Sequence, residues 1–366
     1  MRKIILFQLF ILSFVCFWSC SKTDPYEEPE HITIAIYDGT PQMDYFTQLL
    51  EREWEKAGHK VGLRVLPWDN YGGFPDDDAS LLIYDGVFYS ALRANDLLQP
   101  ISRIPDHCSF DWVYALADGD RYAAPFLLCS SFLIFDKDDD VMSKAGYVTD
   151  VTQETAVPLY SMCPYYYISN LMAKDGPSAL LQDLTGDVDE AAFAPVRHMY
   201  ENWLGSMKFE ATSSSKYDGP ERFNGGSVRA VYNFSETTYD LSSENLSATL
   251  LDPFPDVANR AFNVDYISVR SGLPEGTAKL CEELIAIISS EQFQFEYVDH
   301  EGKVLFCLPA NKAAFGRLAG KYPLYSPLFG YSSSDKNRPM VLGPDFYEEM
   351  GPLKQKIRSL LNGQGL

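Results

Sequence analysis

The sequence lacks the residue patterns that bind metals or nucleic acids. Among 366 residues there are five histidines, and neither a C-x-x-C nor an H-x-x-x-H spacing occurs. The common zinc and redox motifs are therefore absent, and we expect neither a metal nor a cofactor. Basic residues are also few, since 30 Lys and Arg stand against 51 Asp and Glu, a formal net charge of −21. So acidic a surface repels phosphate backbones, which argues against a nucleic-acid partner.

Apolar and aromatic residues, in contrast, are plentiful. Hydrophobic residues make up 46% of the chain, with 23 Tyr and 23 Phe. This composition excludes a disordered or collagen-like chain and a polytopic membrane protein, and the length suffices for two domains. Aromatic side chains without basic charge suit flat, uncharged or cationic small molecules.

The N-terminus has the pattern of an export signal. A basic start is followed by an apolar run from Ile4 to Trp18 and then by Ser19-Cys20. We predict residues 1–19 as a lipoprotein signal peptide and Cys20 as the lipidated residue, which implies an exported, membrane-anchored bacterial lipoprotein. Ordinary signal cleavage or an uncleaved anchor are the alternatives. Residues 20–31 are polar and acidic and are expected to form a tether.

Five cysteines remain beyond the predicted lipidation site, and an odd number leaves at least one thiol unpaired in an exported protein. They are Cys108, Cys129, Cys163, Cys281 and Cys307. Cys281 and Cys307 lie in apolar surroundings typical of a core. The sequence leaves the disulfide state of all but Cys129 open.

Hydrophobic patterns predict an α/β fold with parallel strands. Strands are expected at 32–37, 61–66 and 81–84, with helices at 46–54 and 87–94 between and after them. Ligand crevices in such sheets open at the carboxyl ends of the strands. The residues that follow these three strands are therefore expected to face a crevice: Tyr37-Asp38, Trp68-Asp69 and Asp85.

Two further apolar segments resemble the crossovers of a type II periplasmic binding protein. Phe132 to Phe135 resembles the strand that leaves the first lobe, and Val264 to Val269 the strand that returns. A two-lobed α/β fold with the active site in the inter-lobe cleft follows from this resemblance. The predicted lobes comprise 32–135 with 262–312, and 136–261 with 313–366.

Cys129 is the best candidate for a nucleophile. It follows an apolar strand, precedes Ser130-Ser131, and lies beside the proposed crossover. A nucleophilic thiol needs a base or a lowered pKa. Glu236 is a candidate base, in the first turn of a helix that Ser235 would cap. The alternatives are a buried structural cysteine and a glutamate that only stabilises a helix N-terminus.

Short motifs in a defined order resemble the thiaminase I (thiamine pyridinylase) family. They extend from about Ile32 to Gly351 and read WDNY (68–71), PDD (75–77), YDGVF (84–88), LCSS (128–131), FSE (234–236), DYISV (265–269), LPA (308–310), YPLY (322–325) and LGP (342–344). The family has the fold of a type II periplasmic binding protein. It cleaves thiamine by exchanging the thiazole for an organic base, so thiamine and an acceptor base are the implied substrates of a chain expected to be monomeric.

The resemblance also implies roles for individual residues. Cys129 matches the nucleophile and Glu236 the general base. Two acidic residues, Asp85 and Asp265, match those that hold the aminopyrimidine, whereas Asp111 matches an additional acidic residue weakly. Tyr37 and Tyr71 match aromatic residues of the cleft. The family usually has Gly-Tyr where this chain has Asn233-Phe234, so a phenol near the base is missing.

Two other functions remain open at the level of sequence. A lipoprotein receptor for thiamine or a related pyrimidine would share the fold and the tether, but it would need neither Cys129 nor Glu236. A thiol-dependent hydrolase of another pyrimidine is the third possibility.

Overall fold

The computed structural model describes residues 29–102, 108–116, 121–157, 159–206, 218–238, 241, 245–300 and 303–363. The predicted signal peptide, the predicted lipidation site Cys20 and most of the predicted tether lie outside these residues. In the described part, no helix is both long enough and apolar enough to cross a membrane.

The larger of two main sheets is mixed and has eight strands. Its central order is β13-β5-β10-β3-β1-β2, and β4 and β14 also pair with β10. As expected, β1, β2 and β3 are parallel. The strands are β1 (His31–Tyr37), β2 (Gly62–Trp68), β3 (Leu81–Asp85), β4 (Leu98–Gln99), β5 (Ala124–Cys129), β10 (Arg260–Arg270), β13 (Leu308–Pro309) and β14 (Asn337–Pro339).

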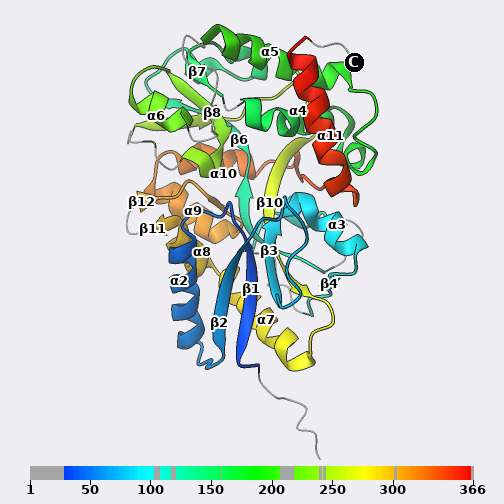
Figure 1. The fold of residues 1–366 in the computed structure, drawn as a ribbon. Coiled ribbons are helices and arrows are strands. Elements are labelled where there is room, and N and C mark those ends of the chain that lie inside the picture. Colours follow the sequence, from blue (N-terminus) through cyan, green and yellow to red (C-terminus); the bar gives the residue numbers. More distant parts are fainter. Residues whose placement is uncertain are drawn as a thin grey trace, which may run out of the picture.

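The smaller main sheet has the order β7-β8-β6-β9. Its strands are β7 (Thr155–Ala156), β8 (Ala230–Phe234), β6 (Ser131–Asp136) and β9 (Leu246–Thr249), and a separate short pair consists of β11 (Asp299–His300) and β12 (Lys303–Val304). The chain passes from β5 of the larger sheet into β6 of the smaller one through a single residue, Ser130. Figure 1 shows the two resulting lobes, with β1 to β3 in the lower half and β6 to β8 in the upper half.

Helices cover both sheets. In Figure 1, α2 and α7 lie beside the larger sheet, while α4, α5, α6 and α11 surround the smaller one. The α-helices are α2 (Met43–Lys56), α3 (Tyr89–Ala94), α4 (Leu159–Asp175), α5 (Glu190–Ser206), α6 (Asp218–Asn224), α7 (Glu275–Ile288), α8 (Glu291–Val298), α9 (Lys312–Lys321), α10 (Tyr325–Ser332) and α11 (Phe346–Leu361). The short 3-10 turns are η1 (Gly86–Phe88), η2 (Asp111–Tyr114), η4 (Met142–Lys144), η5 (Val148–Asp150), η6 (Pro177–Leu181) and η7 (Ser235–Thr238).

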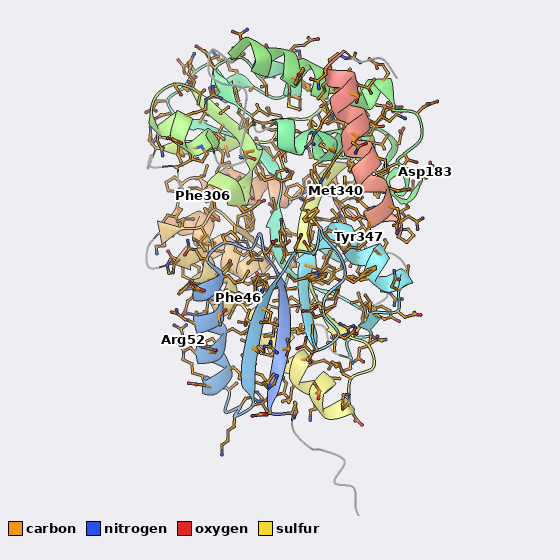
Figure 2. The ribbon with its side chains drawn as sticks, viewed as in Figure 1. Phe46, Arg52, Asp183, Phe306, Met340 and Tyr347 are labelled. Atoms are coloured by element: carbon orange, nitrogen blue, oxygen red, sulfur yellow. The ribbon has the colours of Figure 1, made fainter. Side chains whose placement is uncertain are left out.

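The amphipathic pattern of α2 shows how the sequence builds the core of the larger lobe. Phe46, Leu50 and Trp54 recur at helical spacing and are buried. Phe46 lies on the sheet side of the helix, whereas Arg52 lies on the outer side (Figure 2). The rings of Phe46 and of Phe126 on β5 pack edge to face, with their centroids 5.6 Å apart. The helix thereby supports the strand that carries Cys129.

We expect the centre of the larger sheet to dominate stability. Ile34 on β1 is fully buried, so Ile34→Ala should lower the free energy of unfolding by about 2–5 kcal/mol through lost burial and a cavity. Val141 is an apolar residue that is 56% exposed, and Val141→Ala should change stability by less than about 0.5 kcal/mol. Urea unfolding of both variants measures the difference, and equal losses would contradict this account of the core.

Candidate active site

A cavity of about 200 Å³ lies where the two sheets meet. The larger sheet lines it with the ends of β1, β3 and β5 and with β10. The smaller sheet contributes β8 and the turn η7, and the helices α4 and α11 complete the wall. Six of the sequence-predicted site residues line this one cavity: Tyr37, Tyr71, Asp85, Cys129, Glu236 and Asp265.

Strand register explains why residues distant in sequence meet here. Asp85 at the end of β3 lies directly opposite Asp265 on the antiparallel strand β10. Two residues earlier on β10, Asn263 lies opposite Cys129 at the end of β5. Side chains of directly opposed residues on antiparallel strands are about 4.5–5.5 Å apart at Cβ. The pairing of β10 with β3 and β5 therefore brings the two aspartates and the thiol to one edge.

Two glycines, Gly39 and Gly86, allow the backbone to lie close to neighbouring groups at this edge of the sheet. At Gly86, immediately after Asp85, a Cβ atom would lie 2.6 Å from the carbonyl oxygen of Val264. Only glycine thus lets the chain turn into η1 against β10 at this point. The Tyr37 ring packs over Gly39, where a Cβ atom would overlap the phenol. Both glycines fix the position of a side chain that faces the cavity.

The thiol of Cys129 donates a hydrogen bond to Oε2 of Glu236. Cys129 ends β5 of the larger sheet, whereas Glu236 lies in η7, which follows β8 of the smaller sheet. The pairing of β6 with β8, in which Ser131 lies opposite Phe234, links them. The Ser235 N–H also donates to the Ser130 carbonyl oxygen at 3.1 Å, where η7 begins. Glu236 therefore occupies the first turn of a short helix, as the sequence predicted, and that turn is held against the residue that follows Cys129.

Burial and nearby negative charge keep Cys129 protonated. Burial is the main cause that raises the pKa of this thiol well above its usual value, followed by the charge of Glu236 and those of Asp265 and Asp85. A thiol with a raised pKa is a poor nucleophile on its own. Its hydrogen-bond acceptor is a carboxylate that can take the proton, so the pair can form a thiolate when a reacting group arrives.

Asp265 differs from an ordinary carboxylate for a similar reason. Burial, then the charges of Asp85 and Glu236, raise its pKa well above the usual range. The protonated carboxyl can donate a hydrogen bond, which an ionised carboxylate cannot. Asp85 instead accepts hydrogen bonds, from the Tyr71 hydroxyl at 2.7 Å and from the Val87 N–H at 3.2 Å. The cavity therefore combines a hydrogen-bond donor and an acceptor on facing carboxyl groups.

Tyrosine rings form the apolar part of the wall. The centroids of Tyr37 and Tyr71 are 5.7 Å apart with the planes inclined at 56°. Tyr165 from α4 meets Tyr71 almost perpendicularly, at 86° and 6.1 Å. Burial is the first cause that raises the pKa of all three phenols, so they remain neutral. Neutral rings beside carboxylates suit a flat cation.

Among the cavity residues that the sequence did not single out as site residues, three carry side chains that matter for its chemistry: Tyr165, Lys354 and Cys307. Tyr165 lies in a run of three tyrosines on α4, and Lys354 on the amphipathic helix α11; neither pattern singles out one position as facing a cavity. Cys307 is buried, as expected for core, but it precedes β13, which pairs antiparallel with β5. It therefore also lines the cavity, directly before the strand that pairs with the strand of Cys129.

The other predicted site residue lies apart. Asp111 is exposed on η2 and is not among the residues that line the cavity. No disulfide joins the cysteines at 108, 129, 163, 281 and 307 in the described part of the chain, and Cys281 is buried in α7, as expected for core. Within the described ranges, no group of three or more His, Cys, Asp or Glu side chains could hold a metal ion.

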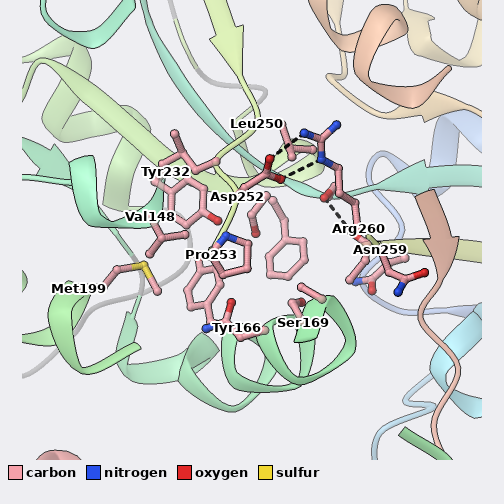
Figure 3. A pocket seen from close by; sticks show the side chains of 18 residues that line it. Val148, Tyr166, Ser169, Met199, Tyr232, Leu250, Asp252, Pro253, Asn259 and Arg260 are labelled. Carbon is pink, nitrogen blue, oxygen red and sulfur yellow. Dashed lines mark hydrogen bonds and ion pairs between the residues drawn. The ribbon is translucent and has the colours of Figure 1, made fainter. Parts of the chain in front are cut away.

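A second, smaller cavity of about 50 Å³ shares two wall residues, Phe234 and Asn263, with the first. Figure 3 shows its charged pair, in which Arg260 donates to both carboxylate oxygens of Asp252, at 2.8 and 2.7 Å. The bidentate pair satisfies both charges internally. The described residues that line this cavity include no thiol, and their one charged pair is internally satisfied, so the larger cavity is the candidate active site.

The raised pKa of Asp265 predicts a pH-dependent effect on stability. Because the folded state holds this proton more tightly than the unfolded chain, the carboxyl favours folding at low pH, and this contribution is lost as the pH rises toward the folded pKa. Asp265→Asn should therefore stabilise the protein progressively more, relative to wild type, from about pH 4 to pH 8. Thermal unfolding across this range measures the difference. The exposed Asp140→Asn serves as a control, and a constant offset for Asp265→Asn would contradict the prediction.

Comparison with known proteins gives one consistent result. No family model matches the chain. Thiaminase-1 of Paenibacillus thiaminolyticus is 23% identical over 361 residues, which cover 90% of this chain and 88% of the relative. Among solved structures, Clostridium botulinum thiaminase I in complex with thiamin has a TM-score of 0.81 at 19% identity and covers 90% of this chain and 100% of that one.

A cyclo/maltodextrin-binding protein complexed with maltotetraose is similar at a TM-score of 0.63 and 16% identity, over 93% of this chain and 94% of that one. The predicted two-lobed α/β fold of the periplasmic-binding-protein type is thus confirmed. The resemblance to thiaminase I, first indicated by short motifs, holds over 90% of the chain in both sequence and structure.

Proposed function

We propose that this protein cleaves thiamine by displacing the thiazole from the pyrimidine methylene with an organic base or another nucleophile. One observation carries the proposal: in a cavity with two further carboxyl groups, the Cys129 thiol donates a hydrogen bond to Glu236. The similarity to thiaminase I, including a structure in complex with thiamin, supports thiamine as the substrate.

The cavity matches the physical properties of thiamine. The molecule is a cation made of two flat rings joined by a methylene group. The carboxylates of Asp85 and Glu236 favour a positive charge, and the rings of Tyr37 and Tyr71 can hold a flat ring by stacking or edge contacts. The low dielectric of a buried site strengthens these interactions.

In the proposed first step, Cys129 adds to the pyrimidine ring while Glu236 takes the thiol proton. The raised pKa of Cys129 means that the thiolate forms only as the new C–S bond develops, which is the function of a general base. Glu236 already accepts the hydrogen bond along which this proton moves. The same residue can later return the proton when the sulfur departs.

Addition to an aromatic ring also requires that the ring accept electron density. Protonated Asp265 can donate a hydrogen bond to a pyrimidine nitrogen, while Asp85 can accept one from the exocyclic amine. Tyr71 and the Val87 N–H fix the orientation of Asp85 for this contact. Together the two carboxyl groups can stabilise the electron-rich adduct.

The adduct then expels the thiazole as a neutral ring, because the electrons of the breaking C–N bond neutralise its positive nitrogen. An acceptor base forms the new bond to the methylene carbon, and loss of Cys129 restores the aromatic pyrimidine. Departure of a stable neutral molecule is what makes the exchange feasible. The reaction needs no metal ion in this scheme.

The N-terminal pattern adds a proposal about location. An exported lipoprotein, anchored through Cys20 and acting as a monomer, would meet thiamine outside the cytoplasm. The acidic tether would hold the catalytic lobes away from the membrane.

A receptor without catalysis is the second candidate, favoured by the similarity to a maltodextrin-binding protein. Such a receptor would bind thiamine or a related pyrimidine between the same lobes. It would have no use for a thiol hydrogen-bonded to a carboxylate in its cavity, and this pair therefore favours the enzyme.

Variants of Cys129 and Glu236 test the catalytic unit. Cys129→Ser should abolish cleavage yet retain thiamine binding, because a hydroxyl is similar in size but much less acidic. Glu236→Gln should lower kcat by about two to four decades. The double variant should be little worse than Cys129→Ser alone, since groups that act as one unit are not additive. Steady-state rates and calorimetric binding measure these effects, and near-normal turnover by Cys129→Ser would reject the mechanism.

A covalent intermediate should accumulate when the acceptor is withheld. Intact-mass spectrometry of wild-type protein mixed with thiamine alone should detect an adduct with the mass of the pyrimidine fragment, and peptide mapping should place it on Cys129. Pyridine added afterwards should release the adduct. Cys281→Ser, which alters a buried thiol in α7, should still form it. Reversible binding with no cleavage by any amine or thiol acceptor would favour the receptor instead.

A further inference from the structure

Among the described residues that line the active-site cavity, Lys354 is the one with a basic side chain. It projects from α11, and its Nζ lies 5.7 Å from the centroid of the Tyr165 ring. The residue is half-buried. In the described parts of the chain, no carboxylate forms an ion pair or a hydrogen bond with it. In a chain with a net charge of −21, a cation without such a partner is conspicuous.

The surroundings of Lys354 penalise its positive charge. Burial is the first cause that lowers the pKa of this lysine, and the charge of Arg358, one helical turn later on α11, is the second. Like charges at this spacing destabilise a helix. An anion bound beside Lys354 would offset both effects.

The cavity consequently has two electrically different ends. Asp85 accepts a hydrogen bond from the Tyr71 hydroxyl, and the Tyr71 ring contacts the ring of Tyr165. The ammonium group of Lys354 in turn lies over the Tyr165 ring. Two aromatic rings therefore separate the acidic end from the cationic one. A ligand that fits both ends carries a cationic or amino-substituted ring at one end and an anionic group at the other.

We propose that Lys354 binds an anionic phosphate on the substrate, so that the site accepts phosphate esters of thiamine as well as thiamine. This inference rests on the proposed function, because it places the pyrimidine at Cys129, Asp85 and Asp265. The hydroxyethyl oxygen of thiamine is on the thiazole, remote from the pyrimidine. A phosphate on that oxygen extends away from the carboxylates, toward the end where Lys354 lies. Lys354 is thus a specificity-determining residue.

Binding measurements test this inference without requiring turnover. In the Cys129→Ser background, calorimetry compares thiamine, thiamine monophosphate and thiamine diphosphate, with and without Lys354→Gln. Loss of the ammonium group should weaken both phosphate esters about tenfold, the equivalent of one charge-assisted hydrogen bond, and leave thiamine unchanged or slightly tighter. Lys354→Arg should retain the preference, and added salt should reduce it.

Lys356→Gln is the matched control, since Lys356 is on the same helix and its Nζ donates to the carbonyl oxygen of Gly186 at 2.6 Å instead of lining the cavity. This variant should bind all three ligands as the parent does. If Lys354→Gln changes the affinity for all three ligands equally, or changes none of the affinities, the inference is overturned. Melting temperatures show whether each variant is folded.

An anionic acceptor is the other chemistry that a lysine here could serve. Turnover of thiamine by the Lys354→Gln enzyme with neutral pyridine or anionic sulfite separates the two. If the variant loses turnover only with sulfite and binds the phosphate esters as tightly as before, Lys354 binds the acceptor and the proposal is rejected. If wild type binds the three ligands with the expected preference but cleaves none of them, the inference about Lys354 stands and the catalytic proposal fails.

Discussion

The geometry of the site depends on the pairing of β6 with β8. That pairing sets Phe234 opposite Ser131. Phe234 is followed directly by η7, and Ser131 is separated from the end of β5 at Cys129 by Ser130 alone. Cys129 and Glu236 are 107 positions apart in sequence, yet a backbone hydrogen bond between their neighbours, from Ser235 to Ser130, fixes their distance. Because backbone groups make this link, the thiol and its acceptor are positioned by the fold and not by flexible side chains alone.

The second organising feature is the concentration of negative charge at the end of the larger sheet. Direct opposition of Asp85 and Asp265 across antiparallel strands costs stability if both are ionised. The fold accommodates the pair by keeping a proton on Asp265 and by surrounding Asp85 with donors. Such a cluster is poor for stability, but in the proposed reaction it would serve to bind a cation and to hold an extra proton.

Local patterns in the sequence were sufficient for much of this architecture. The apolar runs that become β1, β3 and β10, and the helical spacing in α2, identify elements whose burial depends on their own residues. Family motifs then indicated Cys129 and Glu236, which the structure brings together. What sequence could not supply were contributions from the second lobe, such as Tyr165 and Lys354, because which face of a helix meets the cavity depends on the packing of α4 and α11 around it. Asp111, matched only weakly, lies on the surface.

The protonated state of Cys129 inside its cavity also has a consequence for the lifetime of the protein. Peroxides, disulfides and alkylating agents react with thiolates far faster than with thiols. A thiol that loses its proton only to an adjacent carboxylate, inside a cavity walled by tyrosines, offers such reagents little thiolate to attack. In the proposed mechanism, the arrangement that delays activation until a ring is bound would therefore also protect this cysteine from oxidative damage.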